Sequence, residues 1–236
     1  MIPARYQASR FPGKLMQNLS GKSVILTTYQ ATVNTHLFDA VYVVTDSSVI
    51  FDEITNNGGQ AIMSLKSHES GSDRIAEAVA DMNVDVIVNV QGDEPFTKKE
   101  TLAPLLDVFK SDVKNQIALA SLMTPLTDKN DIENPNNVKV TVNKDGFALN
   151  FSRKPISSQQ KDAAIYYKHI GIYAFRKEAL IQFTKLPMAP LEITERLENL
   201  RFIYNNMPIK MLASKYNPIG IDTPEDLENA RQLLDN

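Results

Sequence analysis

Cationic residues are concentrated at the start of the chain, before the first acidic residue, Asp39. The segment 4–19 has no helical or strand periodicity, and a structureless loop longer than about 12–15 residues is usually functional or disordered. Arginine, lysine and free backbone N–H groups suit a polyphosphate, so the segment predicts a site for a small anionic ligand, with a solvated basic loop as the alternative. It lacks the spacing of an NTPase P-loop. The cations are Arg5, Arg10, Lys14 and Lys22.

Two acidic residues follow apolar stretches and could hold a divalent cation. Asp93 lies in VNVQGDEP at 88–95, and Asp222 lies in GIDTPEDL at 220–227, where it ends a short predicted strand. Mg²⁺ takes oxygen ligands and is often held by one or two carboxylates together with substrate phosphates. We therefore expect a Mg²⁺ site at Asp93 and Asp222. The alternatives are a simple turn at Asp93 and a helix-capping role for Asp222.

A third polar stretch, HESGSDR at 68–74, precedes a helical pattern. Ser70 and Gly71 would offer a hydroxyl and backbone N–H groups to a ligand, and the alternative is an ordinary helix cap. Arg74 either faces a ligand or pairs with Glu77, three residues further along the same helix face. The residues alone leave both choices open.

Four further polar residues stand out in the second half of the chain: Arg153, His169, Tyr173 and Glu198. Taken individually, each of them is interpreted as structural. A lone histidine in an apolar strand is more often a core residue than a catalyst. The chain has three histidines, at positions 36, 68 and 169, and their spacing is not that of zinc ligands. A zinc site is therefore not expected.

The elements that would position these residues alternate between strands and helices in the first half of the chain. Apolar strands are predicted at 39–45, 60–64, 84–92 and 116–126, and helices at 47–59 and 71–82. Such alternation is typical of an α/β fold with a Rossmann-like, mostly parallel sheet flanked by helices. Open sheets of this kind bind ligands beyond the carboxyl ends of their strands.

After about residue 124 the pattern becomes richer in strands. It predicts a β-hairpin at 136–153, a strand at 166–175, a helix at 190–206 and a last helix capped by Thr223. We therefore expect a single domain over 1–236, with a core of 1–124 and 216–236 and an inserted β-rich lobe at about 125–215.

Composition narrows the class of protein. The 236 residues are 43% hydrophobic and 22% charged, which is ordinary for a globular chain. The absence of cysteine excludes a disulfide scaffold, a thiolate metal site and a cysteine nucleophile. A net charge of −3 argues against general nucleic-acid binding. No apolar run approaches the roughly 20 residues of a membrane helix, and no signal peptide is visible, so we expect a cytoplasmic protein without a membrane partner.

Taken together and in order, the motifs resemble one family. The stretches that carry the resemblance are IPARYQASRFPGK, SGSDR, VNVQGDEP, NPNNVKV, FSR, HIGIYAF, LENLR and IDTPEDL. They are similar to those of the CMP-Kdo synthetases, the 3-deoxy-manno-octulosonate cytidylyltransferases of the sugar nucleotidyltransferase superfamily. The resemblance implies a Mg²⁺-dependent transfer of CMP from CTP to the anomeric hydroxyl of Kdo, giving CMP-Kdo and pyrophosphate for lipopolysaccharide synthesis. It also implies a homodimer built through the inserted lobe.

The resemblance assigns roles to particular residues. Pro3, Ala4, Arg5 and Lys14 would contact the nucleotide and its triphosphate, with Arg5, Arg10 and Lys14 neutralising charge on the leaving group. Ser70, Gly71, Arg74 and Gln91 would surround the cytidine, and Asp93 and Asp222 would hold Mg²⁺. Arg153, His169, Tyr173 and Glu198 would line the sugar-acid pocket. Asn199 stands where the family commonly has Gln and is one methylene shorter, so its contact would be lost or bridged by water.

Three alternatives stand beside this interpretation. The nearest is a cytidylyltransferase for a related sugar acid such as sialic acid. Another is a non-catalytic nucleotide-binding homologue, against which the intact Arg5, Lys14, Asp93 and Asp222 speak. The third is a nucleotide-sugar glycosyltransferase, which predicts a D-x-D metal motif where this chain has GDEP.

The start of the sequence raises a separate expectation. Only Met1 and Ile2 precede Pro3, whereas a strand of about 5 residues is typical and this strand would be central. We expect a few apolar residues before Met1 in the natural protein, which the intact mass of the native protein would test.

Overall fold

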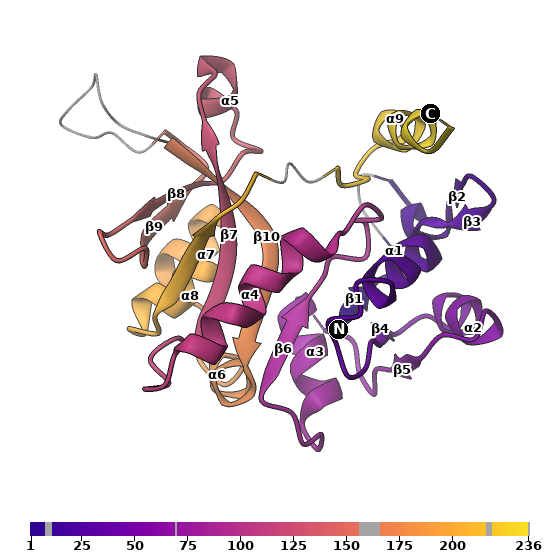
Figure 1. Cartoon of the computed structure of the whole chain (residues 1–236), viewed down its shortest axis with the longest axis horizontal. Helices are drawn as coiled ribbons and strands as arrows, with labels where there is room; N and C mark the ends of the chain where they lie inside the picture. Colours follow the sequence, from indigo (N-terminus) through magenta and orange to yellow (C-terminus); the bar gives the residue numbers. More distant parts are fainter. Residues whose placement is uncertain (8–10, 69, 156–165, 216–218, 236) are drawn as a thin grey trace. The chain divides into compact units, whose positions relative to one another are not determined.

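The computed structural model describes residues 1–7, 11–68, 70–155, 166–215 and 219–235. Its contacts divide the chain into two compact units, one of Met1–Ala103 with Pro218–Asn236 and one of Pro104–Asn217. The second unit interrupts the first in sequence, with its elements coloured from magenta through orange to golden yellow in Figure 1. The expected domain limits of 124 and 216 stay a prediction.

The first unit is built on a parallel sheet. The strands β1 (Ile2–Ala4), β4 (Val43–Thr45) and β5 (Ala61–Met63) pair in that order, with Ile2 opposite Val43 and Val43 opposite Ala61 (Figure 1). Two hydrogen bonds tie the other side of β1 to the strand β6 (Val86–Asn89). The Met1 ammonium donates to the Val88 carbonyl at 2.8 Å, and the Val90 N–H donates to the Met1 carbonyl at 3.0 Å. The first strand is therefore short but central.

Helices accompany this sheet, as expected for an α/β fold. They are α1 (Val24–Val33), α2 (Ser48–Asn56), α3 (Gly71–Val79) and α9 (Pro224–Asp235), with the short 3₁₀ helix η1 (Lys14–Met16) and the ribbon of β2 (Asn18–Leu19) and β3 (Lys22–Ser23). Local sequence sets their ends. The Ser23 hydroxyl accepts the Leu26 N–H at the start of α1. Gly58, with φ +75°, follows the end of α2 in a left-handed conformation.

The second unit is richer in strands. Its sheet contains β7 (Leu119–Leu126), β8 (Lys139–Val142), β9 (Ala148–Ser152), β10 (Tyr166–Arg176) and β11 (Ile209–Ala213), in the order β11-β7-β10-β8-β9. Only β11 and β7 run parallel among these neighbouring strands of the described chain. The short helices are α5 (Lys129–Glu133), α6 (Lys177–Phe183), α7 (Pro190–Glu195) and α8 (Asn199–Tyr204), and α4 (Lys99–Ser111) contains the limit between the units.

The predicted single helix at 190–206 is wrong. Two short helices, α7 and α8, replace it, because Arg196 takes a left-handed conformation with φ +55° and ψ 49°. The Arg196 N–H donates to the Glu192 carbonyl at 2.7 Å and ends α7. Stacked rings hold α8 in the core, with Phe202 and Phe183 4.2 Å apart between centroids.

In the parts of the chain that the structure describes, every helix is too short or too polar to cross a membrane.

Candidate active site

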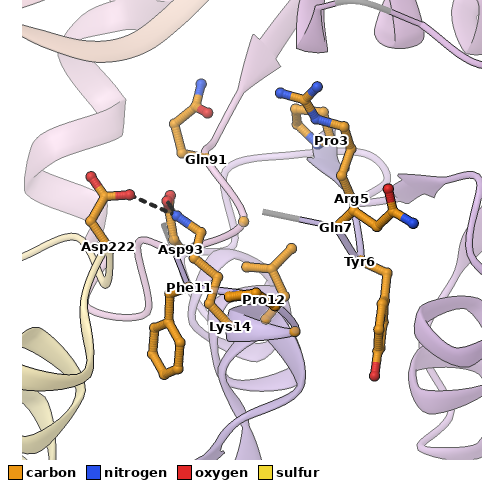
Figure 2. A pocket seen from close by; sticks show the side chains of 13 residues that line it. Pro3, Arg5, Tyr6, Gln7, Phe11, Pro12, Lys14, Gln91, Asp93 and Asp222 are labelled. Carbon is orange, nitrogen blue, oxygen red and sulfur yellow. Dashed lines mark hydrogen bonds and ion pairs between the residues drawn. The ribbon is translucent and has the colours of Figure 1, made fainter. Parts of the chain in front are cut away.

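A cavity of about 750 Å³ opens in the first unit at the carboxyl ends of its strands (Figure 2). Three segments form it: the loop after β1, the turn after β6 and the approach to α9. The lining residues are Pro3, Arg5, Tyr6, Gln7, Phe11, Pro12, Gly13, Lys14, Leu15, Gln91, Gly92, Asp93 and Asp222. The predicted anion-binding loop and both predicted metal ligands thus meet in one cavity.

The loop reaches the cavity by turning back on itself. The Gly13 N–H donates to the Tyr6 carbonyl at 3.2 Å, and the Lys14 N–H donates to the Phe11 carbonyl at 3.1 Å. Gly13 has φ +66°, a conformation that glycine adopts at low cost. The turn places Lys14 at the first position of η1, with its side chain directed into the cavity. Arg10, the third predicted catalytic cation, lies outside the described residues.

Lys14 joins the two acidic residues. Its ammonium nitrogen lies 2.5 Å from Asp93 Oδ2 and 2.8 Å from Asp222 Oδ1 (dashed in Figure 2). Burial alone would lower the pKa of Lys14, but the charge of Asp93 and hydrogen bonds to both carboxylates outweigh it and raise the pKa above its usual value. Lys14 is therefore firmly cationic.

Backbone contacts hold the two carboxylates in place. The Ile221 N–H donates to the Asp93 carbonyl at 3.0 Å, which brings the segment before α9 against the turn after β6. The Thr28 hydroxyl of α1 donates to the Gly92 carbonyl at 2.9 Å. A Cβ at Gly92 would lie 3.3 Å from the Pro3 carbonyl oxygen, so a side chain there would require its neighbours to shift by a few tenths of an ångström.

Asp222 takes part in the cap of α9 through its backbone N–H, which donates to Asp226 Oδ2 at 3.0 Å, while the N-cap itself is Thr223. Thr223 caps α9, as predicted, because its hydroxyl accepts the Asp226 N–H at 3.2 Å while the Asp226 carboxylate accepts the Thr223 N–H at 2.8 Å. The Asp222 carboxylate is thereby left to contact Lys14. The short strand expected before Asp222 is wrong, since 219–222 form no strand.

The residues predicted around the cytidine divide into two groups. Pro3 and Gln91 line the cavity, whereas Ser70, Gly71 and Arg74 are not part of its lining among the described residues. Gly71 nevertheless touches this wall, because a Cβ there would lie 3.2 Å from Pro3 Cγ. Ser70 is the helix cap of α3, with its hydroxyl accepting an N–H at 3.1 Å. Ala4 is 1% exposed within β1.

Arg74 binds an acidic residue that the sequence interpretation missed. Its guanidinium is 1% exposed and donates to Asp46 Oδ2 at 2.7 Å. This hydrogen bond holds the pKa of Asp46 below its usual value, and the charge of Arg5 contributes. Glu77, which was one of the two alternatives for Arg74, instead contacts His68 at 2.5 Å. Asp46 directly follows β4, as Asp93 follows β6, so the position after a buried strand was the available signal.

The residues predicted for the sugar acid lie in the second unit, and four of them gather around β10 and α8. His169 and Tyr173 are in ring contact at 5.4 Å between centroids. The Tyr173 hydroxyl is hydrogen-bonded to Asn199, and burial, with the charge of Glu198, raises the pKa of Tyr173. Burial lowers the pKa of His169 to about 3, so its ring is neutral at pH 7. The Ser121 hydroxyl oxygen lies 2.9 Å from Nε2 of this ring.

Arg153 is anchored separately. Its Nε donates to the Glu195 carbonyl at 2.9 Å, and its backbone N–H donates to Glu195 Oε2 at 3.0 Å. Behind it, Lys139 is 1% exposed and donates to the Arg153 carbonyl at 2.6 Å. The position of Arg153 is thus fixed from β8 and from the end of α7.

A buried ion pair links the two helices that carry Glu195, Glu198 and Asn199. Arg201 of α8 donates from Nε to Glu192 Oε2 of α7 at 2.8 Å and from a second nitrogen to Oε1 at 2.5 Å. Both side chains are at most 6% exposed. Glu192 Oε2 also accepts the Ala189 N–H at 2.9 Å. Glu192 and Arg201 are nine residues apart, a spacing that does not indicate a contact within one helix.

Comparison with known proteins places the chain in a family. A family model described as cytidylyltransferase matches residues 1–210. A 3-deoxy-manno-octulosonate cytidylyltransferase of Christiangramia forsetii is 61% identical over 236 residues, which cover 99% of this chain and 95% of that protein. This chain belongs to the 3-deoxy-manno-octulosonate cytidylyltransferase family. A second family member, from Flavobacterium johnsoniae, is 59% identical over 99% of this chain and 97% of its own.

Solved structures agree with this assignment. The structure of a CMP:2-keto-3-deoxy-manno-octonic acid synthetase complexed with CTP matches with a TM-score of 0.92 and 35% identity, over 99% of this chain and 96% of that one. A 4-diphosphocytidyl-2C-methyl-D-erythritol synthase from Anaerococcus prevotii matches with a TM-score of 0.66 and 15% identity, over 100% and 97% of the two chains, and shares the fold. The expected α/β class with a parallel, helix-flanked sheet is confirmed.

Proposed function

We propose that this chain transfers CMP from CTP to the anomeric hydroxyl of Kdo and releases pyrophosphate. The observation that carries the proposal is the cavity of the first unit, where Lys14, Asp93 and Asp222 converge beside Arg5 in a chain that belongs to this family. A relative of known structure is complexed with CTP. Its nucleotide supports a triphosphate as the anion of this cavity.

The reaction class follows from the chemistry of the two substrates. The anomeric hydroxyl would attack the α-phosphorus in line, and pyrophosphate would leave. Such transfers depend on positioning and on charge stabilisation more than on covalent catalysis. Arg5 and Lys14 supply positive charge to the cavity, where it would stabilise the triphosphate and the leaving group. We assign the same role to Arg10 from the family resemblance.

We propose that Asp93 and Asp222 hold Mg²⁺. The residues fit the ion, since two carboxylate oxygens from distant segments already converge on one cation, the Lys14 ammonium. The described residues contain no cluster of three or more His, Asp or Glu side chains suited to a metal, which agrees with an ion that completes its coordination with phosphate oxygens. When bound, Mg²⁺ would neutralise phosphate charge and favour ionisation of the attacking hydroxyl.

We also propose that the second unit binds the sugar acid. The family resemblance supports this role for Arg153, His169, Tyr173, Glu198 and Asn199, and the last four lie together around β10 and α8. Asn199 reaches the Tyr173 hydroxyl, so its shorter side chain has an internal partner. A homodimer and a role in lipopolysaccharide synthesis complete the proposal on the same family grounds, and a cytoplasmic location stays a prediction from the sequence.

One assay tests the proposed reaction. Pyrophosphate release is measured with CTP and Mg²⁺ against a panel of Kdo, sialic acid and other sugar acids. Release that depends on Kdo supports the proposal. Release with sialic acid alone would identify the rival cytidylyltransferase, and no release with any sugar acid would favour a non-catalytic nucleotide-binding protein.

A further inference from the structure

The ammonium of Lys14 occupies the place that a divalent cation would take. It contacts Asp93 Oδ2 and Asp222 Oδ1 at 2.5 and 2.8 Å, and the Lys14 side chain is only 15% exposed. Mg²⁺ bonds to carboxylate oxygens at about 2.0–2.1 Å. A metal ion on the same two oxygens would compete with the ammonium for their lone pairs and would be repelled by its charge.

Electrostatics leads to the same conclusion. The two carboxylates carry a combined charge of about −2, and Lys14 compensates half of it from within the chain. A divalent cation arriving at this pair would be repelled by the ammonium and would have to replace hydrogen bonds that already satisfy both carboxylates. The carboxylate pair therefore binds metal less tightly while Lys14 is in place.

The cavity offers Lys14 another partner once a nucleotide is bound. Lys14 lines the same cavity as Arg5 and follows the Gly13 turn. A lysine side chain is long and flexible, so its ammonium can move several ångströms without movement of the backbone. The oxygens of a triphosphate would accept the ammonium that the metal displaces.

We infer that Lys14 is an internal counter-ion of the Asp93–Asp222 pair, displaced by the divalent cation and taken up by the triphosphate. This inference rests on the proposed function, since its first half needs a divalent cation at the Asp93–Asp222 pair and its second half needs a nucleotide in the cavity. Metal and nucleotide then bind with positive cooperativity, because each lowers the cost of binding the other. Lys14 is the group through which the two sites are coupled.

Two binding measurements on Lys14→Met test the inference. Without nucleotide, Mn²⁺ affinity measured by electron paramagnetic resonance should rise by about tenfold, within the usual range of coupling between ligands. With EDTA present, the affinity for CTP measured by calorimetry should fall by a similar factor. The two affinities move in opposite directions, whereas damage to the structure would weaken both. Unchanged or weaker Mn²⁺ binding would overturn the inference.

The matched control is Arg5→Met, which removes one positive charge from the same cavity. It should change Mn²⁺ affinity by much less than Lys14→Met, because the Lys14 ammonium lies within 2.8 Å of an oxygen of each carboxylate, whereas the charge of Arg5 acts on Asp46. An equal gain in both variants would mean that net charge alone sets the affinity and would overturn the role of Lys14. Lys14→Gln repeats the test with a polar side chain should the methionine variant fold poorly.

The wild-type chain supplies an independent readout. The Lys14 ammonium signal in a ¹H–¹⁵N spectrum, assigned by its loss in Lys14→Gln, should shift when Mg²⁺ alone is added. Bound Mg²⁺ that leaves this signal unmoved would refute displacement. The Mn²⁺ and Mg²⁺ experiments need neither CTP nor Kdo, so they can succeed when the pyrophosphate assay fails, and the two proposals are separable.

Discussion

The buried pair of Glu192 and Arg201 allows a quantitative prediction. Arg201→Met removes a guanidinium that makes three contacts of 2.5–3.1 Å with the Glu192 carboxylate. Glu192 would remain 5% exposed with its charge uncompensated. Breaking such a pair from one side costs about 3–5 kcal/mol. For a chain of this size, about 2–4 °C of melting temperature per kcal/mol gives a fall of about 6–20 °C.

A double variant shows whether that reasoning is correct. Glu192→Gln added to Arg201→Met removes the stranded charge but keeps an oxygen that can accept the Ala189 N–H. The double variant should therefore be less destabilised than the sum of the two single variants. Urea unfolding of all four proteins, followed by circular dichroism, measures the four free energies. Additive losses, or a loss under about 1 kcal/mol for Arg201→Met, would refute a strong buried pair.

Three further predictions concern the metal ligand Asp222, the turn at Gly13 and the buried His169. Asp222→Asn should fold normally but lose roughly 100-fold or more in Mg²⁺-dependent pyrophosphate release; unchanged turnover would remove Asp222 from the metal site. Gly13→Ala should lower the free energy of unfolding by about 1–2 kcal/mol, because φ at this position is +66°. The new Cβ would meet its nearest atom, the Tyr6 hydroxyl oxygen, at an ordinary 3.7 Å, so the whole cost comes from the backbone conformation. Denaturant unfolding of that variant checks the value. His169 is neutral in the folded protein, because its pKa is about 3 there against 6.5 in the unfolded chain. Its contribution to the free energy of unfolding is therefore fully present above pH 6.5. Below that pH the free energy of unfolding should fall by about 1.4 kcal/mol per pH unit until about pH 3. His169→Phe should lack this slope when unfolding is measured from pH 7 to pH 4.

Local features of the fold were predictable because local forces set them. The cap of α9 at Thr223 and the end of α2 at Gly58 depend on residues within one helical turn. The alternation of apolar strands and helices likewise indicates a parallel sheet before any contact is known. The break at Arg196 was not predictable, since arginine rarely takes a left-handed conformation.

The chemistry of the site was predictable in kind but not in arrangement. Residue types and the rule that ligands bind beyond strand ends pointed to Lys14, Asp93 and Asp222. That Lys14 would contact both carboxylates could not be foreseen, because the three residues are brought together by the order of the strands and by the return of the chain to α9. Arg74 illustrates the same limit, since its partner Asp46 lies 28 residues away.

The interruption of the first unit by the second has a consequence for how the protein is made. Lys14 and Asp222 are 208 residues apart, so at roughly 5–20 residues per second a ribosome needs about 10–40 s to produce one after the other. Asp93 is synthesised 79 residues after Lys14, and for the rest of that interval the two residues can pair with each other. The second carboxylate arrives only after the whole inserted unit has been synthesised. A chain stalled within the insertion therefore carries a cationic loop but lacks a complete pair of metal ligands.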